Sequence, residues 1–207
     1  MSNQSAQTQV AREPGRPRNA ELDETILQAV RELLAEEGYQ SLSVNKVTQR
    51  CGVHVRTIAR RWDSKAEMAA AAILGGDDPL RLGAMAGFPT GSLQSDLREL
   101  IRGNMTYLSD PATRAAFPAL LAELAANPRA QERFVKRERE WEAVIADTLQ
   151  QAVDCGNAPE RILRRGHLVP SILGSVTFMS QFQPWSPSAD TLVDDLADFV
   201  VAALMGP

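Results

Sequence analysis

The sequence predicts an all-α protein with a small N-terminal group of helices and a larger C-terminal group. Apolar residues recur at steps of three and four along most of the chain, as Leu22, Ile26, Val30 and Leu33 do near its start. No stretch of useful length alternates apolar and polar residues, as a half-buried strand would. The chain has 207 residues, 44% of them hydrophobic, which is enough for one or two domains with a sizeable core.

Glycine, proline and capping residues divide this pattern into separate helices. Residues 1–18 are polar and contain two prolines and a glycine, so we expect a disordered arm there. Ser43 can cap the second helix and Gly52 can end it. The sequence Ser64-Lys65-Ala66-Glu67 is a capping box that opens the fourth. The expected helices cover 20–37, 44–51, 55–62, 64–74, 93–108, two proline-interrupted segments within 111–126, 128–153, 159–182 and 189–204.

Charge is distributed unevenly along the chain. The net charge is −4, yet residues 1–65 carry ten basic and eight acidic side chains. Within 45–65 six basic residues accompany a single acidic one, Asp63. A local positive patch on an acidic chain indicates a region that binds a polyanion, although a solvated face with arginines by chance has the same composition. The six residues are Lys46, Arg50, Arg56, Arg60, Arg61 and Lys65.

The same region has the layout of a helix-turn-helix DNA reader, in which a helix, a short helix, a tight glycine turn and another short helix follow one another. On the third helix, Val53, Ile58 and Trp62 can pack inward. The outward residues include arginines, which can bind guanine or phosphate, and methyl groups, which can contact thymine. The DNA-contacting residues that we predict are Ser43, Lys46, His54, Val55, Arg56, Thr57, Arg60, Arg61 and Lys65.

The N-terminal arm contains a Gly-Arg-Pro sequence like that of minor-groove AT-hooks. We predict that Arg16 and Arg18 reach the narrow groove of A·T-rich DNA. The alternative is that the arm is a passive tail.

Residues 20–74 resemble a known family at many positions of fixed spacing. The matching residues are Gly38-Tyr39, Ser43-Val44, Gly52-Val53, Thr57-Ile58, Trp62 and Ser64-Lys65. With them the stretch resembles the N-terminal domain of the TetR family of bacterial transcriptional regulators. Three positions depart from the family. His54, a poor helix cap, stands at a common serine position, Ala59 replaces a tyrosine that commonly touches the DNA backbone, and Trp62 replaces a phenylalanine.

The resemblance implies a homodimeric repressor-like protein that binds double-stranded DNA at a palindromic operator. We therefore divide the chain into a DNA-binding domain at 19–75 and a C-terminal ligand-binding and dimerisation domain at 76–207. The last two long helices would form the dimer through Ile172, Val176, Leu192, Leu196, Phe199 and Val200. The alternative is that these residues only close the core of a monomer.

The resemblance also implies a small-molecule ligand in the C-terminal helices. Candidate pocket residues are Met105, Tyr107, Phe117, Phe134, Trp141, Phe178 and Met179, with ordinary core packing as the alternative. Few buried charges can be recognised among these helices, so we expect a neutral or weakly polar, mostly apolar ligand.

Other functional classes find little support. The chain lacks the usual motifs of hydrolases, P-loop enzymes and dinucleotide-binding enzymes, so we expect no enzyme, cofactor or metal. Cys51 and Cys155 form no CxxC pair, and no apolar run is long enough to span a membrane. We expect a cytoplasmic, nucleoid-associated protein. An alternative is a helical protein-interaction scaffold that has lost DNA binding. Ala59 favours it, and the six basic residues argue against it.

Overall fold

The computed structural model describes residues 20–74, 88–180 and 189–206, and all regular secondary structure in these residues is helical, as predicted. The expected arm with Arg16 and Arg18 lies outside them. No described helix is long and apolar enough to cross a membrane. The helices are α1 (Ala20–Ser41), α2 (Val44–Cys51), α3 (Val55–Ala59), α4 (Lys65–Leu74), α5 (Leu93–Ser109), α6 (Pro111–Glu123), the 3-10 turn η2 (Leu124–Ala126), α7 (Pro128–Asp154), α8 (Arg161–Arg164), α9 (Leu168–Ser180) and α10 (Ala189–Met205).

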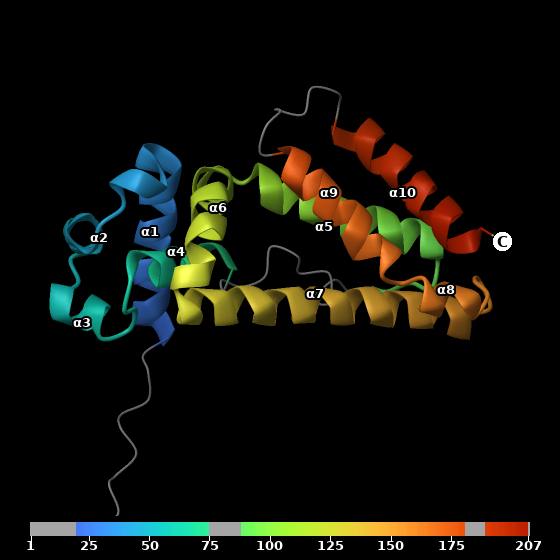
Figure 1. Ribbon diagram of the computed structural model, residues 1–207, viewed down its shortest axis with the longest axis horizontal. Helices are drawn as coiled ribbons and strands as arrows, with labels where there is room; N and C mark the ends of the chain where they lie inside the picture. Colours follow the sequence, from blue (N-terminus) through green and yellow to red (C-terminus); the bar gives the residue numbers. More distant parts are fainter. Residues whose placement is uncertain (1–19, 75–87, 181–188, 207) are drawn as a thin grey trace, which may run out of the picture.

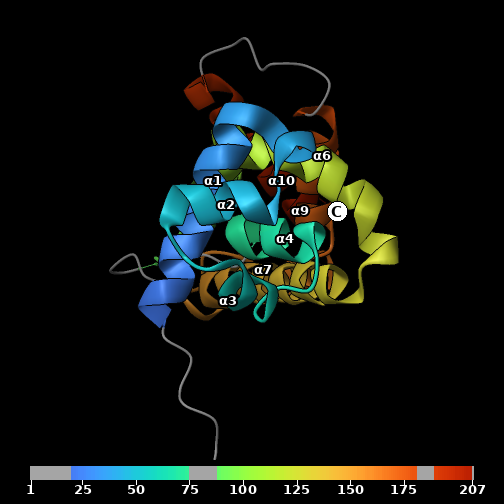
Figure 2. The same ribbon diagram turned by 90° about the vertical axis from the view of Figure 1, so that its left-hand side faces the viewer.

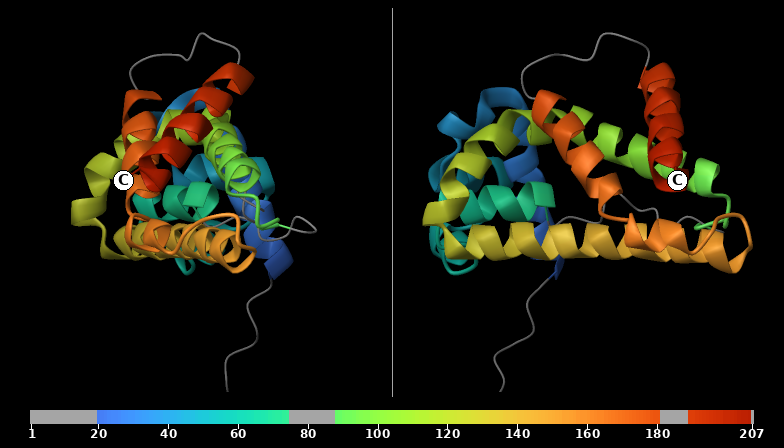
Figure 3. Two further views of the ribbon diagram at one scale, coloured as in Figure 1. Left: turned by 90° about the vertical axis from the view of Figure 1, so that its right-hand side faces the viewer. Right: turned by 45° about the vertical axis from the view of Figure 1, so that its right-hand side comes forward.

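Two groups of helices lie at opposite ends of the molecule (Figure 1). One group comprises α1–α4, with α6 packed against α1 and α4, and the other comprises α5 and α8–α10. The long helix α7 runs beneath both groups (Figure 3). Each group has its own cluster of buried aliphatic and aromatic side chains. The N-terminal group and the rest of the chain are thus joined mainly through α4, α6 and α7.

Two glycines shape the N-terminal group. Gly38 has φ 78° and ψ 170°, which interrupts the helical path of α1 and turns Tyr39 back into the core. Gly52 has φ 71° and ends α2, where its N–H donates to the carbonyl of Thr48 at 2.9 Å. Side chains with a Cβ disfavour such positive φ values, so glycine suits both bends. At the other end of α2, the Oγ of Ser43 accepts from the N–H of Lys46 at 3.3 Å, which is the predicted N-cap.

The third helix is shorter than predicted. It ends at Ala59, and a turn in which the N–H of Arg61 donates to the carbonyl of Ile58 at 2.9 Å leads on to Trp62. The chain must reverse here within a few residues to enter the capping box at Ser64. This tertiary requirement overrides the helical pattern that extended to Trp62.

The predicted helix over 159–182 is also wrong, because α8 and α9 are separate helices. Between them, the N–H of Leu168 donates to the carbonyl of Arg165 at 2.9 Å in a tight turn. Gly166 lies in this turn, where an added Cβ would come within 3.1 Å of Leu149 on α7. The turn lets α8 lie along the end of α7 while α9 crosses back towards α5 (Figure 1).

Candidate nucleic-acid interface and ligand cavity

The helix α3 presents one face to solvent at the end of the molecule. Figure 2 views this end and shows α2 and α3 in front of the other helices. Ile58 is fully buried and anchors the inner side of α3. On the outer side Val55, Arg56 and Arg60 are exposed, and Thr57 is half-buried. The division into inward and outward sets therefore follows the sequence prediction except at Arg61, which was predicted to face outward and has a side chain only 11% exposed.

His54 caps α3, contrary to the expectation that histidine is a poor helix cap. Its Nδ1 accepts from the N–H of Arg56 at 3.2 Å. A ring nitrogen with a free lone pair can take the place of the usual serine oxygen, because the backbone of His54 is extended and directs the side chain back over the first turn. The cap orients α3 and leaves the rest of the ring exposed.

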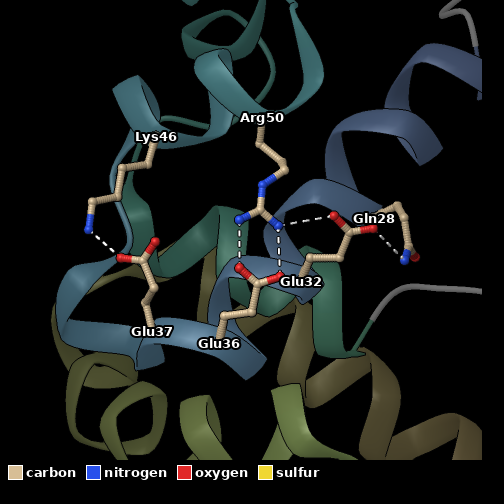
Figure 4. Close-up of polar contacts among 6 residues, drawn as sticks. All are labelled: Gln28, Glu32, Glu36, Glu37, Lys46 and Arg50. Atoms are coloured by element: carbon tan, nitrogen blue, oxygen red, sulfur yellow. Dashed lines mark hydrogen bonds and ion pairs between the residues drawn. The ribbon is translucent and has the colours of Figure 1, made fainter.

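Lys46 and Arg50, both on α2, are bound to carboxylates of the second half of α1 (Figure 4). Arg50 donates from Nη2 to Glu36 at 2.6 Å and from Nη1 to Glu32 at 3.2 Å. The hydrogen bond from Arg50 lowers the pKa of the Glu36 carboxyl below its ordinary value. Lys46 forms an ion pair with Glu37. These pairs fasten α2 to the end of α1 and neutralise both cations in the DNA-free protein.

Two more basic residues, Arg61 and Lys65, follow α3 and contact residues of α1 or the end of α3. Arg61 pairs through Nε with Asp23 of α1, and its Nη1 donates to the carbonyl of Thr57 at 3.2 Å. The side chain of Arg61 is only 11% exposed. The ammonium of Lys65 lies 4.4 Å from the centroid of the Tyr39 ring, a cation–π contact.

Arg56 and Arg60 are therefore the two members of the six-residue patch for which the described part of the chain offers neither an ion pair nor a cation–π contact. Fewer basic side chains are thus available to an outside anion than the six counted in the sequence. Those that remain lie on α3 or directly after it, on the side that faces solvent. Ser43 remains exposed at the start of α2 while its Oγ caps that helix.

The capping box predicted from the sequence forms with one difference, because Glu67 accepts from the N–H of Asp63 and not from that of the cap residue Ser64. Ser64 Oγ accepts from the N–H of Glu67 at 3.0 Å, and Glu67 Oε2 accepts from the N–H of Asp63 at 2.7 Å. Glu67 is only 3% exposed. Two arginines of α7 lie near it. Arg129 Nη1 is 2.8 Å from Asp63 Oδ2 and 3.7 Å from Glu67 Oε2. Arg133 Nη2 is 3.7 Å from Glu67 Oε1. The joint between α3 and α4 is consequently in contact with α7.

A cavity of about 270 Å³ lies where the two hydrophobic cores meet, between α4, α5, α6, α7 and α9. Leu74, the last residue of α4, contributes to its wall. Of the seven predicted pocket residues, Met105 is buried in the C-terminal core and is not among the lining residues, and the side chain of Met179 lies outside the described structure. The other five line the cavity: Tyr107, Phe117, Phe134, Trp141 and Phe178.

Four polar side chains in the cavity wall were not predicted from the sequence: Asn104, Arg137, Glu138 and Thr177. Arg137 is 9% exposed and lies over the Tyr107 ring, with Cζ 5.5 Å from the ring centroid. Burial raises the pKa of Tyr107, so its hydroxyl stays neutral. Partial burial also raises the pKa of Glu138, against an opposing effect of Arg137. The signal for Arg137 was its register, since it lies three residues after Phe134 and four before Trp141 on α7.

The six predicted interface residues of α9 and α10 differ in how much of each side chain is exposed. Phe199 is 60% exposed, whereas Ile172, Leu192 and Leu196 are half-buried. Val176 and Val200 are buried within the single chain and pack in its C-terminal core. Of the six predicted interface residues, these two therefore have little surface left to give to a partner.

Comparison with known proteins assigns the chain to a family. Residues 26–72 match the family model described as bacterial regulatory proteins, tetR family, and residues 89–200 match the tetracyclin repressor-like C-terminal domain. The chain belongs to the TetR family of transcriptional regulators. It is therefore a helix-turn-helix, DNA-binding regulator and not an enzyme.

Relatives agree with this assignment over nearly the whole chain. An uncharacterized HTH-type transcriptional regulator of Mycobacterium tuberculosis is 34% identical over 199 residues, which cover 92% of this chain and 94% of the relative. Two solved structures share the fold at 15% identity. They are the transcriptional regulator FadR of Bacillus subtilis in complex with stearoyl-CoA (TM-score 0.64; 87% and 98% covered) and a regulator of Saccharomonospora viridis in complex with choline (TM-score 0.63; 88% and 97% covered).

Proposed function

We propose that this TetR-family regulator is a repressor that leaves its operator when a small molecule occupies the cavity. Two copies bind an inverted repeat, with one α3 entering a major groove in each half-site. The half-site centres are about 34–36 Å apart, or a multiple of that distance, since helix-turn-helix dimers read successive turns of one face of the duplex. We place the protein in the cytoplasm, associated with the nucleoid.

The exposed face of α3 carries this proposal. Arg56 is positioned to bind a base edge, and Val55 and Thr57 can offer methyl groups to thymine. Arg60, at the end of α3, is positioned for a phosphate, as are the exposed hydroxyl of Ser43 and ring of His54. Lys46 and Lys65 remain proposed phosphate contacts that first have to leave Glu37 or the Tyr39 ring, whereas Arg61 stays bound to Asp23 and positions α3.

Release from DNA requires a structural link between the cavity and the helix-turn-helix, and α4 lies between the two. Its last residue, Leu74, lines the cavity, and its first turn follows the reader through the capping box at Ser64. Every residue of α4 from Ala66 to Leu74 is buried, so a displacement at one end is transmitted by packing rather than absorbed by solvent. A ligand shifts the protein between its two states only by the difference in its affinity for them.

The structural relatives support a ligand response, because FadR of Bacillus subtilis was solved with stearoyl-CoA and the Saccharomonospora viridis regulator with choline. The cavity here is about 270 Å³, just below the range of about 300–1,000 Å³ that is typical of ligand pockets. We infer that this protein takes a smaller ligand than an acyl-CoA.

We further propose that the dimer forms through α9 and α10. Phe199 is largely exposed, and Leu192, Leu196 and Ile172 give a half-buried apolar surround. Two such helices from each protomer would form a four-helix contact with twofold symmetry.

The test is selection of bound duplexes from a random pool with the full chain, followed by titration on the enriched sequence. We expect an enriched inverted repeat and affinity that falls steeply with salt. The Arg56→Ala, Arg60→Ala double variant is the control and should enrich no sequence, while its thermal unfolding stays that of the parent. A wild-type protein that binds no duplex at low salt would refute the proposed function.

A further inference from the structure

We infer that the cavity selects a small organic anion, a carboxylate on a body of about one aromatic ring, whose oxygens bind Asn104 and Tyr107 beside the Arg137 guanidinium. This inference rests on the proposed function, because it names the ligand class for the same cavity. It departs from the neutral ligand expected from the sequence, and the reason is the group of polar side chains that the fold brings into an otherwise apolar wall.

Two of these side chains have unsatisfied polar atoms. Asn104 is 9% exposed and Tyr107 is 7% exposed, and neither Asn104 Nδ2 nor the Tyr107 hydroxyl has a hydrogen-bond partner among the residues that the structure describes. The two residues lie three positions apart on α5 and both line the cavity, so they share one face of that helix. Buried polar atoms without a partner are rare in folded proteins, because each has lost its hydration without gaining a hydrogen bond in return. A ligand that offers acceptor atoms would remove that cost at both.

The third side chain selects the charge of the ligand. Arg137 comes from α7, lines the same cavity and stacks over the Tyr107 ring, with Cζ 5.5 Å from the centroid. An amide N–H, a phenol O–H and a guanidinium can all donate, and carboxylates accept from guanidinium groups particularly well. The cavity wall therefore favours oxygen acceptors with a negative charge.

A cationic ligand is disfavoured by the same arrangement. The face of the Tyr107 ring, which could otherwise hold a quaternary ammonium, already carries the Arg137 cation. The only other charged residue described in the cavity wall is Glu138, which remains in contact with solvent. Water screens that carboxylate, whereas the buried Arg137 acts in a medium of lower dielectric constant.

The remaining wall determines the body of the ligand. Phe117 and Phe134 lie with ring centroids 6.4 Å apart and planes tilted by 41°, and Trp141 and Leu173 line the cavity as well. These surfaces suit a flat apolar group. A volume of about 270 Å³ leaves space for one ring and a short chain rather than a long acyl tail.

Three probes of similar size and different charge test the inference on the full chain. They are 3-phenylpropionate, its neutral amide 3-phenylpropionamide, and trimethyl(2-phenylethyl)ammonium, each titrated by calorimetry. We expect the carboxylate to bind at least about tenfold more tightly than the amide, because a hydrogen bond to a charged group is stronger than one to a neutral group. The ammonium should bind least.

Variants then locate the head group. Tyr107→Phe and Asn104→Leu should each weaken 3-phenylpropionate binding by about tenfold and leave the amide less affected. Neither variant should lower the melting temperature, because each removes a buried unsatisfied group, so loss of binding cannot be attributed to unfolding. Thr106→Ala is the matched control, since Thr106 is exposed on the same helix and its hydroxyl donates to the carbonyl of Arg102, away from the cavity wall.

Equal or tighter binding of the amide or the ammonium would overturn the inference. Binding of none of the three probes at millimolar concentration would also overturn it, as would carboxylate binding that both variants leave unchanged. Duplex binding by the ligand-free protein is measured separately. If it persists while the probes fail, only the ligand class is rejected. If the carboxylate binds but no duplex does, the proposed function fails and the ligand site stands.

Discussion

Arg60 and Arg61 are neighbours of the same chemical type, yet the structure gives them different tasks. Arg60 is exposed and has no ion pair among the described residues, whereas Arg61 is bound to Asp23 and to the carbonyl of Thr57. We predict that Arg60→Ala weakens DNA binding through the loss of a phosphate contact. Arg61→Ala should instead weaken the fold and leave the salt dependence of DNA binding nearly unchanged.

The magnitudes follow from the contacts. Each lost phosphate contact reduces the slope of log affinity against log salt by about 0.9, so a dimer with Arg60→Ala loses about 1.8 in slope. The side chains of Arg61 and Asp23 are 11% and 23% exposed, which places their ion pair between surface pairs and fully buried ones. Breaking it should therefore cost about 1–2 kcal/mol per protomer in the free energy of unfolding.

Fluorescence anisotropy with labelled operator at several salt concentrations measures the slopes, and urea unfolding measures stability. Asp23→Asn serves as a control, because it breaks the same ion pair while keeping Arg61. It should destabilise the fold without flattening the slope. If Arg61→Ala flattens the slope as much as Arg60→Ala does, Arg61 leaves Asp23 on binding DNA, and the reasoning from the DNA-free structure is wrong.

Four further outcomes are expected. Arg56→Ala should cost about 1–3 kcal/mol on the operator and relax base preference at one position per half-site, as titration of substituted duplexes would show. Leu196→Arg should give the mass of a single chain in light scattering and lose operator affinity. Deletion of 1–18 should weaken binding by about tenfold or less, most where A·T pairs flank the half-sites, and equal losses on G·C flanks would contradict minor-groove insertion. Glu36→Gln should lower the melting temperature at neutral pH. The difference in melting temperature should shrink below pH 4.5. Arg50 lowers the pKa of Glu36 in the folded state, so the ion pair stabilises the fold above pH 4.5 and this stabilisation is lost as the pH falls through the lowered pKa.

Local signals in the sequence predicted most helices well. The N-cap at Ser43, the glycine stop at Gly52 and the serine cap at Ser64 all form as predicted, since each depends only on residues within one turn of the chain. The predicted helix boundaries were wrong where contacts with residues far away in the sequence determine the path of the chain. The helix over 159–182 breaks at Gly166 because the chain must pass close to Leu149, and α3 stops early because the chain turns towards α4.

The candidate site shows the same division. The inward and outward sets on α3 could be predicted, because helical spacing determines which residues share a face. The pairing of Lys46, Arg50 and Arg61 could not, since their carboxylate partners lie up to 38 positions away in the sequence. Five aromatic residues of the cavity were predicted from their apolar character, but Arg137 was not, because an arginine within a run of charged residues usually indicates a solvated face.

The sequence by itself determined the all-α fold class, the helix caps, the helix-turn-helix and the family resemblance, since these depend on the spacing of residues along the chain. Only the tertiary structure decided how many of the basic residues remain available to DNA and what the cavity can bind. Packing α2 and α3 against α1 brings carboxylates to Arg50 and Arg61. Packing α7 against α5 buries Arg137 beside Asn104 and Tyr107. Charges and hydrogen-bond donors act over a few ångströms of space, and neighbours at that distance exist only after the helices have packed.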